Sequence, residues 1–164
     1  MIEPKTRTME ERLKKIRAED IMSKFAITTT EDTRISDLAH LMMRFKISGI
    51  PVIKDGKICG IVSATDLFNL MGKIIKEIGR GRAPDDYYAT PVKELMTSNV
   101  ISVQKDMNLT EIMKIMTGYN IHTLPVMESD KIIGIIGRRD VINACFFEAF
   151  EESKVKDERK ANAK

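Results

Sequence analysis

The sequence predicts an α/β protein with an internal duplication: two β-α-β-β-α units form two small three-stranded sheets, with helices packed about a pseudo-twofold axis. The first observation is a self-match at a constant offset of 74 residues, without a gap, from about residue 20 to residue 71. The second is that short apolar runs alternate with segments of helical periodicity in each copy. Because chance similarity would not keep register through turns, we interpret the match as duplication of one unit.

Each unit begins with a short extended segment, at 26–29 and at 100–103, and continues into an amphipathic helix. Apolar residues recur at helical spacing over 35–45 and over 109–119. In the second copy, Asn108 and Glu111 stand three residues apart, as a capping box requires, whereas Arg34 is a poorer cap in the first.

A β-hairpin and a second helix complete the unit. In the first copy, the strands at 50–53 and 58–62 flank the turn Lys54-Asp55-Gly56-Lys57, and the second copy has its turn at 128–131. The apolar residues that follow, from Leu67 to Ile78 and from Val141 to Phe146, predict the second helix of each copy.

These elements divide the chain into five parts. We expect an N-terminal accessory segment at 1–17 with a helix over 9–16, a first motif at 18–78, an exposed linker at 79–91, a second motif at 92–149, and a charged, disordered tail at 150–164. A unit of about 50 residues buries too little apolar surface to be stable alone. The two units should therefore pack together and create two clefts related by the pseudo-twofold axis.

Composition narrows the functional class. The chain has 164 residues, 43% of them hydrophobic, and a net charge of +3, which is far from the basic stripe of a dedicated nucleic-acid binder. It has no secretion signal and no apolar run near 20 residues, so we expect a cytoplasmic protein that does not enter a membrane.

Cys59 and Cys145 lie in apolar segments, which favours reduced, buried thiols. The cysteines and two histidines lack metal-ligand spacing, so no metal site is expected.

No catalytic motif is evident either. We find no nucleophile with an adjacent base, no pair of carboxylates in a common motif and no Walker loop. The sequence therefore predicts a protein that is not an enzyme.

The repeated frames "GIVSATD" (60–66) and "GIIGRRD" (134–140) are the candidate binding motifs. Ser63 and Asp66 stand at a strand-to-helix junction, where a carboxylate can accept hydrogen bonds from two vicinal ribose hydroxyls and a serine can add another. The alternative is a helix cap formed by the same pair, and the two roles are compatible. Asp140 keeps the carboxylate in the second copy, but Gly137 has no hydroxyl, which weakens the expected ribose contact there.

Arg138 and Arg139 stand at the start of the second copy's final helix. The amide N–H groups and the dipole at a helix N-terminus already favour anions, so arginines there suggest a bound phosphate. Ordinary solvated arginines are the alternative. Lys46, at the end of the first amphipathic helix, is a further phosphate candidate, although a helix-terminal lysine also suits the dipole.

The repeat resembles the CBS-domain family, named for cystathionine beta-synthase, and its tandem pair, the Bateman module. The resemblance covers about residues 18–148 and lies in the openings "DIM" and "ELM", the strands "GIPV" and "TLPV", and the two frames above. It implies a regulatory module without catalysis of its own, which binds AMP, ADP, ATP or S-adenosylmethionine and pairs into a disk-like dimer.

The resemblance also implies further site residues. His122, whose counterpart in the first copy is Ser48, occupies a place where relatives hold phosphate, although a lone histidine beside a strand is often only a surface residue. Backbone groups near the first strand and apolar walls beside the proline form the family's adenine pocket. The matching positions are Thr28, Ile50, Pro51, Ser102, Leu124 and Pro125.

Two other functions remain open. One is a nucleic-acid or protein interaction module with a basic patch of Arg80, Arg82, Arg138 and Arg139. The other is a dimeric scaffold with empty clefts. In every case we expect a homodimer through apolar helix faces that carry Met42, Met43, Phe45, Met71, Met113 and Met116, and an unidentified regulated partner protein.

Overall fold

The structure is a computed structural model that describes residues 9–81 and 85–146. The first unit contains the elements α2 (Ala18–Ile21), β1 (Thr29–Thr30), α3 (Ile35–Phe45), β2 (Gly49–Lys54), β3 (Lys57–Ser63) and α4 (Ala64–Ile78). The second contains a 3-10 helix (Val92–Glu94), β4 (Val103–Gln104), α6 (Leu109–Gly118), β5 (Thr123–Glu128), β6 (Lys131–Gly137) and a helix described over 138–146. Helix α1 (Met9–Leu13) precedes the first unit and α5 (Asp85–Tyr88) connects the two; the predicted tail at 150–164 lies outside the described residues.

The duplication and the fold class are confirmed by the two sheets. Their strand orders are β1-β2-β3 and β4-β5-β6, and in each sheet the first pair is parallel and the second antiparallel. The registers also agree: Ile50 pairs with Val62, and their counterparts Leu124 and Ile136 pair with each other. The first strands are shorter than the predicted segments 26–29 and 100–103 and begin at their last residue, because only Thr29–Thr30 and Val103–Gln104 pair with a neighbouring strand.

Local sequence explains the turns and caps. Asp55 and Gly56 both have positive φ, 50° and 75°, as a two-residue type I′ hairpin requires. The Asn108 side chain accepts a hydrogen bond from Glu111 N–H (3.0 Å), which confirms the predicted capping box of α6. Arg34 makes no side-chain cap at the start of α3.

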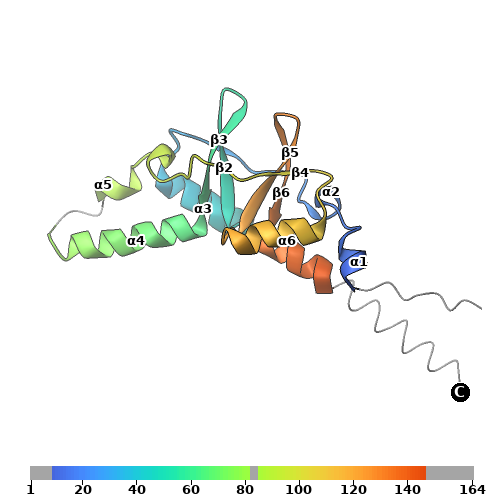
Figure 1. Cartoon of the computed structure of the whole chain (residues 1–164). Coiled ribbons are helices and arrows are strands. Elements are labelled where there is room, and N and C mark those ends of the chain that lie inside the picture. Colours follow the sequence, from blue (N-terminus) through green and yellow to red (C-terminus); the bar gives the residue numbers. More distant parts are fainter. Residues whose placement is uncertain (1–8, 82–84, 147–164) are drawn as a thin grey trace, which may run out of the picture.

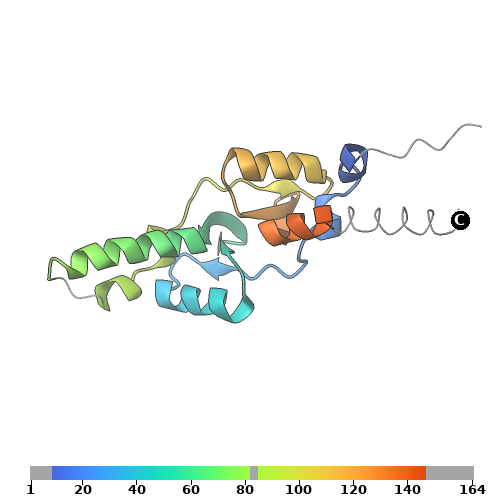
Figure 2. The same ribbon diagram turned by 90° about the horizontal axis from the view of Figure 1, so that it is seen from below.

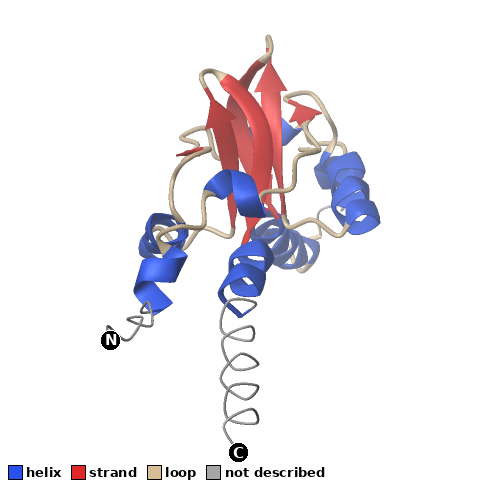
Figure 3. Cartoon of the chain, turned by 90° about the vertical axis from the view of Figure 1, so that its right-hand side faces the viewer, coloured by secondary structure: helices blue, strands red, loops and turns tan. Residues whose placement is uncertain are grey.

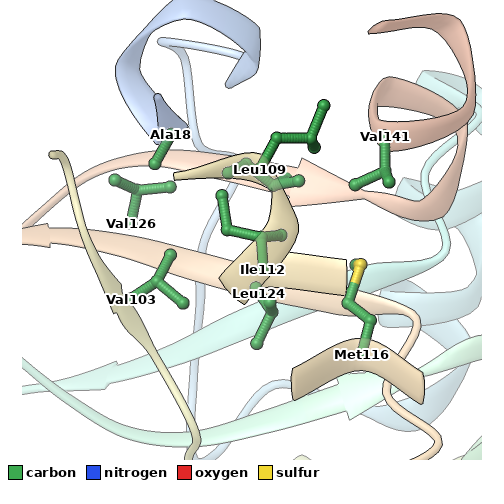
Figure 4. Close-up of a cluster of buried hydrophobic side chains, with 9 residues drawn as sticks. Ala18, Val103, Leu109, Ile112, Met116, Leu124, Val126 and Val141 are labelled. Carbon is green, nitrogen blue, oxygen red and sulfur yellow. The ribbon is translucent and has the colours of Figure 1, made fainter. Parts of the chain in front are cut away.

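The segment before β1 belongs to the core of the other unit. Ala18 is fully buried among Val103, Leu109 and Val126 of the second unit (Figure 4). Its N–H donates to Met107 C=O (2.9 Å), and Ser23 exchanges two backbone hydrogen bonds with Ile135 of β6.

The exchange is reciprocal. Val92, at the start of the second motif, is fully buried in the first unit's core, and its N–H donates to Thr33 C=O (2.8 Å). Thr97 and Ile61 exchange two backbone hydrogen bonds, as Ser23 and Ile135 do. The end of the predicted linker also joins the first unit, since Ile35 N–H donates to Thr90 C=O (3.0 Å). The two units are therefore interlocked, and each core needs residues from both.

The interlocking gives the glycine of each repeated frame a structural reason. A Cβ at Gly60 would overlap the side chain of Met96, and a Cβ at Gly134 would overlap that of Met22. Met22 and Met96 are counterparts in the repeat, so each methionine lies over the glycine of the opposite unit.

The two sheets stand next to each other, with helices α3, α4 and α6 at one end of the strands (Figures 1 and 3). Helix α4 extends away from the sheets and α5 lies beside it, as both views show (Figures 1 and 2). None of the helices in the described residues is long and apolar enough to cross a membrane.

Candidate functional site: two related clefts

Cleft I is a cavity of about 720 Å³ formed by both units. The first unit contributes the segment before β1 and the connection from α3 to β2, including Lys46 and Ser48. The second unit contributes the junction between β6 and the following helix, including Asp140. The first residues of α4 also line this cleft.

Cleft II is the pseudo-twofold counterpart of cleft I, with a volume of about 360 Å³. Here the first unit contributes the junction between β3 and α4, with Ser63 and Asp66. The second unit contributes residues 97, 99, 101 and 119–123. The exchange of segments between the units therefore builds both clefts, because each combines the strand-to-helix junction of one unit with the first-strand segment of the other.

The predicted ribose end of cleft II is a complete capping box. Asp66 Oδ2 accepts hydrogen bonds from Ser63 N–H (2.7 Å) and Ser63 Oγ–H (2.7 Å), and Ser63 Oγ accepts one from Asp66 N–H (3.3 Å). The cap interpretation is therefore confirmed for this pair. The serine hydroxyl already uses its proton, so it could contribute to a ligand only as an acceptor.

The ribose end of cleft I keeps half of this arrangement. Gly137 N–H donates to Asp140 Oδ2 (2.7 Å), as Ser63 N–H does to Asp66. Among the described residues, the hydrogen bonds of both aspartates use Oδ2, which leaves Oδ1 of each carboxylate for a further donor. The caps thus hold both carboxylates in one orientation at the edge of a cleft.

The predicted phosphate residues gather at cleft I. Lys46, Arg138 and Arg139 all line it, and Arg138 N–H donates to His122 C=O (3.1 Å). Both arginines thus line the cleft that also contains Asp140. Their counterparts are Asn120, Ala64 and Thr65, so none of the described residues that line cleft II is a lysine or arginine.

The predicted adenine pocket needs a correction. Ile50 and Leu124 are fully buried in the two cores, as Figure 4 shows for Leu124, and the prolines that follow them are also buried. The side chains of Ile50 and Leu124 lie in the two cores, and neither they nor the prolines are among the residues that line the clefts. The apolar walls of the clefts are instead formed by isoleucines of both units. They are Ile27, Ile47 and Ile135 in cleft I, and Ile61, Ile101 and Ile121 in cleft II.

Thr28 and Ser102 are exposed and directly follow two of these isoleucines. Their backbone groups therefore remain near the first-strand side of each cleft.

Cleft I has an aromatic lining that the sequence did not indicate. Phe25, Phe45 and Phe68 line this cleft and are 95%, 46% and 78% exposed. They come from a loop and two different helices, so no spacing in the sequence connects them. Large exposed apolar side chains of this kind often mark a contact surface.

The two cysteines lie outside both clefts. Burial raises the pKa of the Cys59 thiol, with the Glu31 carboxylate adding to the effect, and burial also raises the pKa of Cys145. Both thiols are free and protonated at neutral pH, which makes them poor nucleophiles.

Comparisons with known proteins give the family. The CBS domain matches twice, at residues 18–73 and 92–146. The chain is 34% identical over 128 residues to inosine-5'-monophosphate dehydrogenase of Aquifex aeolicus, covering 73% of this chain but only 24% of that protein. It is 32% identical over 149 residues to the uncharacterized protein MJ1426 of Methanocaldococcus jannaschii, covering 76% of this chain and 88% of that protein.

A solved structure agrees in fold. The crystal structure of CBSX2 in complex with AMP superposes with a TM-score of 0.66 at 27% identity, covering 82% of this chain and 98% of that chain. The duplicated fold and the two matches to the CBS domain lead to the same result. The chain belongs to the CBS-domain family and carries two CBS domains in tandem.

Proposed function

We propose that this chain is a non-catalytic regulatory module that binds adenosine-containing ligands in the clefts between its two CBS domains. The observation that carries the proposal is the pair of capped carboxylates, Asp66 and Asp140, each held at the edge of a cleft with one oxygen left for a ligand. A carboxylate in this state can accept hydrogen bonds from vicinal ribose hydroxyls. The AMP complex of CBSX2, a protein of the same fold, supports an adenosine ligand.

The charge of the clefts supports a division of ligands. Cleft I is larger and contains three cationic side chains, so we assign AMP, ADP or ATP to it. Cleft II has a carboxylate and neutral polar groups, which suit the ribose of a ligand with less negative charge. S-adenosylmethionine, whose sulfonium is positive, is the alternative for cleft II.

Binding would act on a regulated partner protein, since we assign no reaction to either cleft. The chain spans about a quarter of inosine-5'-monophosphate dehydrogenase of Aquifex aeolicus, which is consistent with a module that accompanies a catalytic domain. A ligand that bridges the two units would stabilise one arrangement of them, and the partner would respond to that arrangement.

Calorimetric titration with adenosine, AMP, ATP and S-adenosylmethionine tests the proposal. We expect at least one of them to bind and to raise the melting temperature, because a ligand that binds only the folded state stabilises it by mass action. A chain that binds none of the four at millimolar concentration would support the scaffold function instead.

The variant Arg138→Ala/Arg139→Ala tests the assignment of phosphate to cleft I. It should lower the affinity for ATP more than the affinity for adenosine. The difference between the two losses should narrow as salt is raised, because the contacts are exposed and screened over about 8 Å at physiological ionic strength. Equal losses for both ligands at every salt concentration would mean that the arginines do not contact phosphate.

A further inference from the structure

The two clefts share one imidazole. Thr65, His122 and Thr123 line both cavities and so form a partition between them. His122 is half-buried there. Its counterpart Ser48 lines only cleft I, and the Ser48 hydroxyl shares a hydrogen bond of 3.3 Å with Thr123 Oγ1. The partition therefore has one nitrogen-bearing side chain where a symmetric protein would have two.

The clefts depend on this imidazole to different degrees. A phosphate in cleft I could be held by Lys46, Arg138 and Arg139 even without His122. In cleft II, His122 is the one side chain among the described lining residues that can carry a positive charge. The other nitrogen donors there are the side-chain amides of Asn99 and Asn120, which form weaker hydrogen bonds to phosphate than a charged group does.

We propose that His122 couples the two clefts, so that a phosphate-bearing ligand in cleft I weakens the binding of a second phosphate-bearing ligand in cleft II. The inference rests on the proposed function, because it requires adenosine ligands in both clefts. A phosphate in cleft I holds the imidazole on its own side of the partition, and the phosphate in cleft II then loses the imidazole as a hydrogen-bond donor. A ligand without phosphate does not use the imidazole and is not affected.

The coupling is measurable at cleft II itself. The backbone amide of Ser63 is bonded to Asp66 at the edge of cleft II, and that of Gly137 is bonded to Asp140 at the edge of cleft I. In two-dimensional NMR spectra of the ¹⁵N-labelled chain, these two amide signals report the occupancy of each cleft separately during a titration with AMP.

The decisive comparison is between the wild type and Arg138→Ala/Arg139→Ala. Both arginines are exposed, so the variant should fold. It weakens the binding of AMP in cleft I, so the imidazole of His122 is available to a phosphate in cleft II. We expect the Ser63 signal to titrate at an AMP concentration lower by about tenfold, the order expected for one hydrogen bond to a charged group. Adenosine should titrate the Ser63 signal equally in both proteins.

His122→Ala separates this coupling from simple repulsion between two phosphates. In that background, the arginine substitutions should no longer change the AMP titration of Ser63, whereas repulsion would persist without the imidazole. Ser48→His is the matched gain of function, because it gives the phosphate in cleft I an imidazole of its own. His122 then remains available to cleft II, and AMP should bind cleft II more tightly while cleft I is filled.

Three results would overturn the inference while leaving the proposed function intact. They are an unchanged Ser63 titration in the arginine variant, a change that survives in His122→Ala, and the same change with adenosine. If AMP moves neither amide signal, the coupling fails. If adenosine, ATP and S-adenosylmethionine also move neither signal, the proposed function fails with it.

Discussion

At the residue scale, each cleft aspartate has a structural role that can be separated from binding. Asp66 closes a capping box with Ser63, and Glu111 closes the same box with Asn108 at the start of α6. Glu111 is not among the residues that line the two clefts. The chain thus contains a matched pair of capping acids, of which one belongs to a cleft.

Asp66→Ala should weaken adenosine binding in cleft II by about 1.5–3 kcal/mol, the range for hydrogen bonds to a charged group. It should also cost about 0.3–1 kcal/mol of folding stability, because a first-turn acid is lost while Ser63 Oγ still accepts a hydrogen bond from the N–H of residue 66. Glu111→Ala is the control, with a similar loss of stability and unchanged binding. Calorimetry and chemical denaturation of both variants check this, and equal affinities in the two would reduce Asp66 to a cap.

Gly137→Ser should restore the hydroxyl that cleft I lacks. A Cβ at residue 137 would meet only Asp140 Oδ2 at 3.5 Å and His122 C=O at 3.9 Å, so the serine fits without strain. Its hydroxyl can repeat the bonds of Ser63 and present an acceptor to the ribose. We expect adenosine to bind cleft I more tightly by about 0.5–1.5 kcal/mol. A higher melting temperature with unchanged affinity would show that the hydroxyl only caps the helix.

At the element scale, the exchanged segments hold the two units together. Met22 precedes β1 but lies over Gly134 in β6, and Met96 lies over Gly60 in β3. These contacts join residues far apart in the sequence at the two places where a backbone segment of one unit pairs with a strand of the other. The glycines therefore allow close packing between the units.

Gly134→Ala should destabilise the fold by about 1–3 kcal/mol, the usual cost of overpacking. The added methyl would overlap Met22 and approach Ser23 C=O at 3.0 Å. Gly72→Ala in the middle of α4 is the opposite control: nothing lies within 4 Å of its Cβ position, and alanine favours a helix by about 0.5–1 kcal/mol. Urea denaturation should give a lower free energy of unfolding for Gly134→Ala and a higher one for Gly72→Ala. Changes of the same sign in both variants would contradict the proposed packing role.

At the scale of the whole molecule, the apolar helix surface changes the predicted dimer interface. Met42 and Met116 are only 5% exposed and belong to the cores, so they cannot form an interface as the sequence suggested. The exposed apolar side chains on α3 and α4 are Met43, Phe45, Phe68, Met71, Ile75 and Ile78. We propose that these helices form the surface through which two chains pair.

Ile75→Glu should shift the protein from dimer to monomer, because it places a charge on a side chain that is 66% exposed on α4 and outside both clefts. Asn69→Glu on the same helix adds the same charge at a polar, exposed position and should leave the dimer unchanged. Light scattering at micromolar concentration measures the mass of each. A wild type with the mass of one chain would contradict the dimer, and a dimeric Ile75→Glu would place the interface elsewhere.

The sequence by itself determined the local structure of this protein. The helical spacing of α3 and α6, the turn at Asp55-Gly56 and the Asn108 cap each depend on neighbours a few residues away, so pattern and propensity were sufficient. The offset of 74 residues then showed that the second unit repeats the first. The capped aspartates were found for the same reason, since the cap lies within four residues.

Only the tertiary structure decided how the copies combine. In a duplicated chain, the segment before the first strand of each unit can pack against its own unit or against the other unit. Both arrangements satisfy the same periodicity of the sequence. The structure shows exchange, which brings Lys46 of one unit to Arg138 and Asp140 of the other and leaves His122 between two clefts. It also buries Ile50 and Leu124, which the sequence placed at a ligand, because the side of a sheet that faces the core depends on contacts between distant residues.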